Sequence, residues 1–245
     1  MTLSGHTSKV NSVSFGENNI LASGSEDRTI KIWNVTNGEL LRTMNGHIAS
    51  IKSVSFGEDN ILATGSVDKT VKIWNTTNGE LIRTLNGHIW SVNSVAFGED
   101  NILASGSNDK TIKIWNVTNG KLLRTLSGHS ASVKIVSFGK GNILASGSRD
   151  YKIKLWNVTN GELIRTLNGH NWAVNAISFG KDNILASGSE DSTIKIWNVI
   201  NGELLRTLNG NALAVNGISF GEDSLLASGS ENNYVTKKII KYKKL

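Results

Sequence analysis

The feature that most limits the fold of this chain is a repeat of 41 residues. The dipeptide Gly-His returns at this interval, and a tryptophan followed by asparagine keeps the same period. The tryptophans are Trp33, Trp74, Trp115, Trp156 and Trp197, and a sixth copy begins with Gly210 and Asn211 in place of Gly-His. A period of this length predicts a repeat protein, in which each copy is one structural unit that packs against its neighbours.

Each copy contains four short runs of apolar and β-branched residues, separated by polar turns. In the first copy the runs cover Val10 to Phe15, Ile20 to Ser25, Thr29 to Trp33 and Leu40 to Met44. No stretch keeps helical spacing for three turns, so each copy is expected to form an antiparallel meander of four strands. Such sheets bury each other's faces when they stack in a ring. The sequence therefore predicts an all-β propeller of six four-stranded blades.

The first run of each copy breaks strict alternation. Its apolar residues in the first copy are Val10, Val13 and Phe15, a gap of three followed by a gap of two, which predicts a β-bulge. The bulge should turn the residue after the first apolar position toward the central opening. The copies carry Asn11, Lys52, Asn93, Lys134, Asn175 and Asn216 there. Lys52 and Lys134 are candidate contacts for an acidic group, with simple solvation as the alternative.

These columns resemble the WD-repeat family of β-propellers over essentially the whole chain. The resemblance implies that a histidine, a serine or threonine, an aspartate and the blade tryptophan form a hydrogen-bonded network in each blade. Carried over to this sequence, the five sets are His6, Ser23, Asp27 and Trp33; His47, Thr64, Asp68 and Trp74; His88, Ser105, Asp109 and Trp115; His129, Ser146, Asp150 and Trp156; and His170, Ser187, Asp191 and Trp197. Buried imidazole and indole groups need such partners, so a satisfied network would make each blade rigid.

The chain departs from the family pattern in several places. It has no proline, and Trp-Asn replaces Trp-Asp. In the sixth copy Asn211, Asn232 and Lys238 occupy the histidine, aspartate and tryptophan positions, and only Ser228 of the network remains. We therefore expect a degenerate sixth blade and an incomplete closure of the ring. The expected domains are a single propeller over residues 1–236 and a basic tail over residues 237–245.

Charge and composition restrict the partners and the compartment. Five lysines lie in the last nine residues, and subtracting their charges from the formal net charge of +6 leaves +1. The basic character therefore belongs to the tail, which makes nucleic acid an unlikely partner of the body of the protein. The chain has no cysteine, no apolar leader and no apolar run long enough to cross a bilayer. We expect a cytoplasmic protein without membrane insertion, with the nucleus as an alternative.

The sequence offers no catalytic, metal-binding or cofactor-binding cluster. Every one of the five histidines belongs to the Gly-His column, so no irregular group of titratable residues is left for a catalytic site. A histidine, an aspartate and a serine could imitate a hydrolytic triad, but a nucleophile needs one exposed, asymmetric pocket and this set recurs five times. We therefore predict that the chain is not an enzyme.

Variation between the copies concentrates on one rim of the predicted propeller. The loops after Gly-His and the turns between second and third strands share this rim and differ between copies, whereas the opposite turns recur almost unchanged. Candidate partner-binding residues on the rim are Ile48, Ile89, Trp90, Arg149, Tyr151, Trp172 and Leu213. Trp90 and Trp172 lie outside the blade column and either anchor a partner or pack under their loops.

The sequence thus predicts a non-enzymatic scaffold that binds partner proteins or peptides on its variable rim. Two alternatives stay open: a detached propeller fragment of a larger multidomain sensor or regulatory protein, and a nucleic-acid binder that uses the basic tail. The sequence identifies no particular partner and no oligomeric state.

Overall fold

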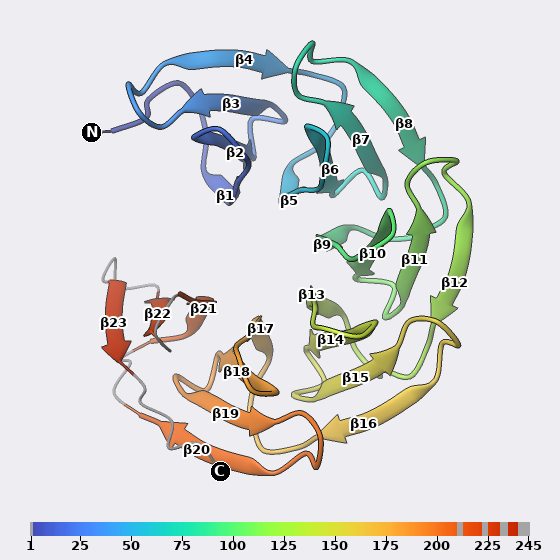
Figure 1. Ribbon diagram of the computed structural model, residues 1–245, viewed down its shortest axis with the longest axis vertical. Helices are drawn as coiled ribbons and strands as arrows, with labels where there is room; N and C mark the ends of the chain where they lie inside the picture. The colour runs from blue at the N-terminus through green and yellow to red at the C-terminus, as the bar shows by residue number, and fades with distance from the viewer. Residues whose placement is uncertain (1, 210–212, 222–224, 231–234, 240–245) are drawn as a thin grey trace. The chain divides into compact units, whose positions relative to one another are not determined.

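The computed structural model describes residues 2–209, 213–221, 225–230 and 235–239, and all regular elements in this part of the chain are β-strands (Figure 1). The chain divides into two compact units, one over residues 1–127 and the other over residues 128–245. Each unit contains three antiparallel meanders, in which every strand pairs with the next strand along the chain.

The first unit holds three sheets of four strands. The first sheet contains β1 (Val10–Phe15), β2 (Ile20–Ser25), β3 (Ile30–Asn34) and β4 (Leu40–Met44). The second contains β5 (Ile51–Phe56), β6 (Ile61–Ser66), β7 (Val71–Asn75) and β8 (Leu81–Leu85). The third contains β9 (Val92–Phe97), β10 (Ile102–Ser107), β11 (Ile112–Asn116) and β12 (Leu122–Leu126).

The second unit holds two sheets of four strands and one of three. Its first sheet contains β13 (Val133–Phe138), β14 (Ile143–Ser148), β15 (Ile153–Asn157) and β16 (Leu163–Leu167). The next contains β17 (Val174–Phe179), β18 (Ile184–Ser189), β19 (Ile194–Asn198) and β20 (Leu204–Leu208). The last contains β21 (Val215–Phe220), β22 (Leu225–Ser230) and β23 (Val235–Ile239).

The strand pattern predicted from the sequence is confirmed, and so is the bulge in the first strand of each sheet. In the first sheet Val10 pairs with Ser25 and Ser12 pairs with Gly24, so that Asn11 is the extra residue. The same register shift follows the first residue of β5, β13, β17 and β21. The spacing of apolar residues by three and then two therefore reports a real irregularity of the backbone.

The hydrophobic core lies between neighbouring sheets within each unit. The first strand of a sheet packs against the first two strands of the sheet before it: β5 against β1 and β2, and β17 against β13 and β14. One buried cluster of the first unit combines Ala22, Ile30 and Ile32 of one sheet with Ile51 and Val54 of the next. Because each meander has two apolar faces, stacking is what removes both from water.

The sixth copy differs from the other five. Its sheet has three strands among the described residues, whereas each of the first five copies has the four expected strands. Lys238 pairs with Leu226 in the register in which Trp197 pairs with Leu185, which places the lysine in the tryptophan column. Ser228 is buried, whereas Asn211 and Asn232 lie outside the described residues.

The strand β23 runs across the boundary expected between residues 236 and 237. Residues 237–239 pair with β22, and residues 240–245 of the basic tail lie outside the described part. The division of the chain into a propeller domain and a tail, and the incomplete closure of a ring, stay predictions.

Candidate interaction surface

The structure brings the four side chains of each repeat set within hydrogen-bonding distance. In the third sheet, His88 lies 2.7 Å from Asp109 through Nδ1 and 2.8 Å from Ser105 through Nε2. The indole N–H of Trp115 donates to the same Ser105 hydroxyl at 2.8 Å. The other four sets have the same connections, with all three distances between 2.7 and 2.9 Å.

The direction of these hydrogen bonds follows from what each group can donate. An ionised carboxylate only accepts, so Nδ1 of the histidine carries the proton and Nε2 accepts from the serine or threonine hydroxyl. Burial raises the pKa of the Asp150 carboxyl, but hydrogen bonds from His129, Ser130 and Lys152 have a larger opposite effect. The pKa therefore falls below its ordinary value, to about 2. Burial lowers the pKa of His170 below its ordinary value despite the nearby Asp191. Burial also raises the pKa of Asp191, but hydrogen bonds from Thr193, Asn171 and His170 lower it by more, to about 2. At neutral pH the pair of His170 and Asp191 is therefore an ionised aspartate with a neutral imidazole.

The repeated histidine, aspartate and serine have the connectivity of a hydrolytic triad but not its access. Ser105 is fully buried, and its oxygen already accepts the indole N–H of Trp115. A substrate carbonyl could not approach that hydroxyl without opening the blade. Among the described residues, no group of three or more histidine, cysteine, aspartate or glutamate side chains is placed to hold a metal ion.

The network also fixes the loops that follow Gly-His. The Asp109 carboxylate accepts the backbone N–H of Ile89 at 3.2 Å, just after the histidine. A second buried serine, Ser107, donates to the backbone oxygen of Trp90 at 3.1 Å and accepts the backbone N–H of Asp109. Sequence reasoning missed this serine, which recurs in each repeat. It is the last residue of the second strand of each sheet and always follows a glycine. The members of this serine column in the first five sheets, Ser25, Ser66, Ser107, Ser148 and Ser189, are all fully buried.

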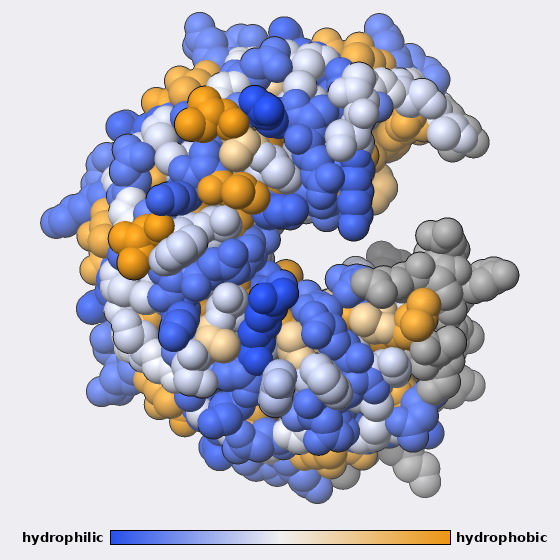
Figure 2. Space-filling view, turned by 180° about the vertical axis from the view of Figure 1, so that it is seen from behind, coloured by the Kyte–Doolittle hydropathy of each residue, from blue (hydrophilic) through white to orange (hydrophobic). Residues whose placement is uncertain are grey.

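The variable residues on these fixed loops are exposed. Trp90 and Trp172 have 60% and 57% of their surface exposed, so neither packs under its loop. Ile48 and Ile89 are more exposed still, and Leu213 and Tyr151 are each a little under half exposed. Arg149 is exposed as well. Figure 2 shows one face of the molecule, on which apolar residues form separate patches within a mainly hydrophilic surface.

Each rim tryptophan contacts a residue from the preceding sheet. The Lys69 ammonium lies 5.9 Å from the ring centre of Trp90, a cation–π distance. The rings of Tyr151 and Trp172 lie 6.2 Å apart and are tilted by 50°. Lys69 and Tyr151 both have a left-handed backbone, with φ of 72° and 70°, at the tip of a second-to-third turn. These contacts join two loops of neighbouring sheets into one surface.

The residues at the bulge position make contacts of their own. Asn11 donates to the backbone oxygen of Ile51 at 2.8 Å, which ties its sheet to the next. The Lys52 ammonium lies 3.7 Å from the carboxylate of Glu26 and forms an ion pair with this residue of the preceding sheet. Lys134 is half-buried and has interactions within the chain. An acidic partner group at Lys52 and Lys134 stays a prediction.

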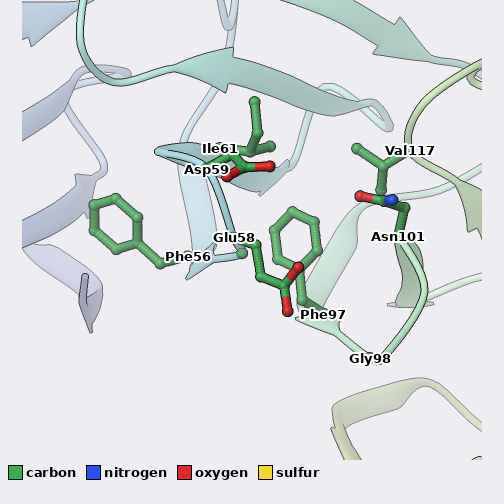
Figure 3. Close-up of a pocket in the computed structure, with 9 residues that line it drawn as sticks. Phe56, Glu58, Asp59, Ile61, Phe97, Gly98, Asn101 and Val117 are labelled. Carbon is green, nitrogen blue, oxygen red and sulfur yellow. The ribbon is translucent and has the colours of Figure 1, made fainter. Parts of the chain in front are cut away.

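Cavities on the opposite side of the sheets were not foreseen from the sequence. One of about 250 Å³ in the first unit has Asp59 and Ile61 on one side and Asn101 and Val117 on the other (Figure 3). A counterpart of about 450 Å³ in the second unit is lined by Lys140 and Lys181, which replace the glutamates of the first unit's turns. These turns vary in charge more than their repeated glycines and asparagines suggest. The replacement of glutamate by lysine in these turns was the feature of the sequence that could have pointed to this difference in charge.

In the described part of the chain, no helix is long and apolar enough to span a membrane.

The chain contains stacked four-stranded meanders, in each of which a buried tryptophan donates to a serine or threonine hydroxyl that a histidine also binds. These features define it as a propeller of the WD type. Comparison with protein families shows that it belongs to the WD40 family, described as WD domain, G-beta repeat, which matches residues 1–34, 38–75, 79–116, 120–157 and 161–198. The sixth copy lies outside these matches, in agreement with the loss of its network residues.

Among solved structures, the chain is similar to the crystal structure of the computationally designed Ika8 protein. The two are 38% identical, with a TM-score of 0.81, and the match covers 96% of this chain and 72% of that one. A comparison with curated proteins found no match.

Proposed function

We propose that this chain is a protein-interaction scaffold that binds partner proteins or peptides through its variable rim, with Trp90 and Trp172 as anchors. The observation that carries the proposal is the exposure of these two tryptophans, 60% and 57%, on loops whose backbones are held by buried serines. An exposed aromatic ring on a fixed backbone loses little conformational freedom when it binds, and tryptophan is enriched among binding hot spots.

A role without catalysis is supported by the family and by the chemistry of the repeat. WD40 propellers are generally non-catalytic scaffolds. In the described residues each histidine binds both an aspartate and a buried hydroxyl, which leaves neither ring nitrogen for a substrate.

The proposal is tested by affinity capture from a lysate with three forms of the full chain. These are the wild type, the double variant Trp90→Ala with Trp172→Ala, and Ile200→Ala as the control. Ile200 is an apolar residue that is slightly more exposed than the two tryptophans, at 68%, but it lies in a turn between third and fourth strands, at the opposite end of its sheet. We expect the wild type and the control to retain the same proteins, identified by mass spectrometry. The double variant should bind them more weakly by about 2 kcal/mol or more.

Retention of the same proteins by the double variant, or an equal loss with Ile200→Ala, would refute the role of the rim tryptophans.

A further inference from the structure

The two rim tryptophans occupy the same position of the repeat, two copies apart, but their surroundings differ. Trp90 is contacted by Lys69, and Trp172 is contacted by Tyr151. Lys69 and Tyr151 also share one repeat position, the left-handed tip of the turn in the preceding sheet. The first unit thus shows that the face of the rim tryptophan can bind an ammonium group.

In the second unit that ammonium is replaced by a second aromatic ring. Tyr151 and Trp172 are both exposed, at 44% and 57%, and their tilted rings lie 6.2 Å apart. The negative faces of aromatic rings attract cations, and two rings attract them more strongly than one. At this position the tyrosine replaces the lysine ammonium group. It also adds a second ring face, to which a cation of a partner can bind.

The second-to-third turn of the sheet that follows Trp172 begins with a glutamate, Glu190. The backbone N–H of Glu190 donates to the backbone oxygen of Ala173, the residue after Trp172, at 2.9 Å. The corresponding residue beside Trp90 is the uncharged Asn108, whose N–H donates to Ser91 at 2.9 Å. In the turn of Tyr151, Arg149 stands where the first unit has Val67, and Lys152 stands where it has Thr70. The two sites therefore differ at the tryptophan face by an aromatic ring in place of an ammonium group, and not by a loss of positive charge from the turn.

We infer that Tyr151 and Trp172 bind an alkylammonium group of a partner, of the kind that a lysine side chain carries. The inference rests on the proposed function, because it names the chemistry recognised at one of the two rim anchors. It also assigns different roles to the two tryptophans: Trp90 is occupied by an internal cation, whereas Trp172 receives an external one.

The test is a titration of the full chain with tetramethylammonium chloride, followed by the indole ¹H–¹⁵N signal of Trp172. Sodium chloride at equal concentration is the control for ionic strength. The main variant is Tyr151→Lys, which places the lysine of the first unit at this position. It should fold normally, because Lys69 and Lys110 already occupy this turn position in other copies.

We expect the Trp172 signal of the wild type to shift with saturation, and binding to be about two- to fivefold weaker in Tyr151→Lys. The reciprocal variant Lys69→Tyr should make the Trp90 signal respond as well, since it rebuilds the aromatic pair in the first unit. Equal binding by Tyr151→Lys and the wild type, or no response of Trp172 beyond that to sodium, would overturn the inference.

This outcome can be separated from failure of the proposed function. If Trp172→Ala abolishes capture of partners while Tyr151→Lys leaves the titration unchanged, the rim binds partners but not through an ammonium group.

Discussion

At the scale of single residues, the network could be anticipated because a role shared by all blades leaves the same type of residue in each copy, with Thr64 as the one exchange of serine for another hydroxyl. The structure places His88 between Asp109 and Ser105, as the family resemblance implied. The serine column that includes Ser107 repeats just as regularly, yet it was missed. A serine at a strand end has many ordinary uses, and only the loop carbonyl on its hydroxyl reveals its role.

The network predicts a specific stability loss when its histidine is removed. Replacing His88 by Ala should lower the free energy of unfolding by about 1–3 kcal/mol, because Asp109 and Ser105 would each lose a buried partner. The measurement is denaturant unfolding followed by circular dichroism. The neighbouring Ile89→Ala is the matched control, since Ile89 is 68% exposed and should change stability little. Equal effects of the two substitutions would contradict the structural role of the histidine.

At the scale of the blade, strand boundaries and bulges could be read from the sequence because each run is short and bounded by turn residues. Packing between blades could not, since it depends on which glycine faces which valine. A Cβ added to Gly65 would meet Val92 at 2.7 Å and Val95 at 3.1 Å. The glycine of this column therefore permits close approach of the next sheet.

This close approach predicts opposite effects for two glycines in the same repeat position. Gly65→Ala should destabilise the chain by about 1–3 kcal/mol, because it overpacks the contact with β9. Gly229→Ala should be neutral or slightly stabilising, since no described atom lies within 4 Å of its added Cβ. Denaturant unfolding of both variants checks the difference. A Gly65→Ala protein as stable as Gly229→Ala would show that the sheets do not pack as closely as described.

At the scale of the whole chain, the copies share the residues that form the blades and differ mainly in the loops of the rim. The fold class followed from the period, and Trp90 and Trp172 were singled out because they break it. Their different neighbours, Lys69 and Tyr151, could not be foreseen, because the period does not show which side chains of adjacent sheets meet. The sixth sheet kept its strand register after losing its tryptophan, since the apolar residues of β21 and β22 remain.

The central claim is that the repeated tryptophans hold the blades while the rim tryptophans bind partners. The most direct test measures unfolding free energy and partner capture together for Trp197→Ala and Trp172→Ala. Trp197 is 2% exposed, so its loss should cost about 3–5 kcal/mol of stability. Trp172→Ala should keep nearly the stability of the wild type and lose partner binding. A Trp172→Ala protein that is destabilised as much as Trp197→Ala, or that binds partners as well as the wild type, would contradict the account.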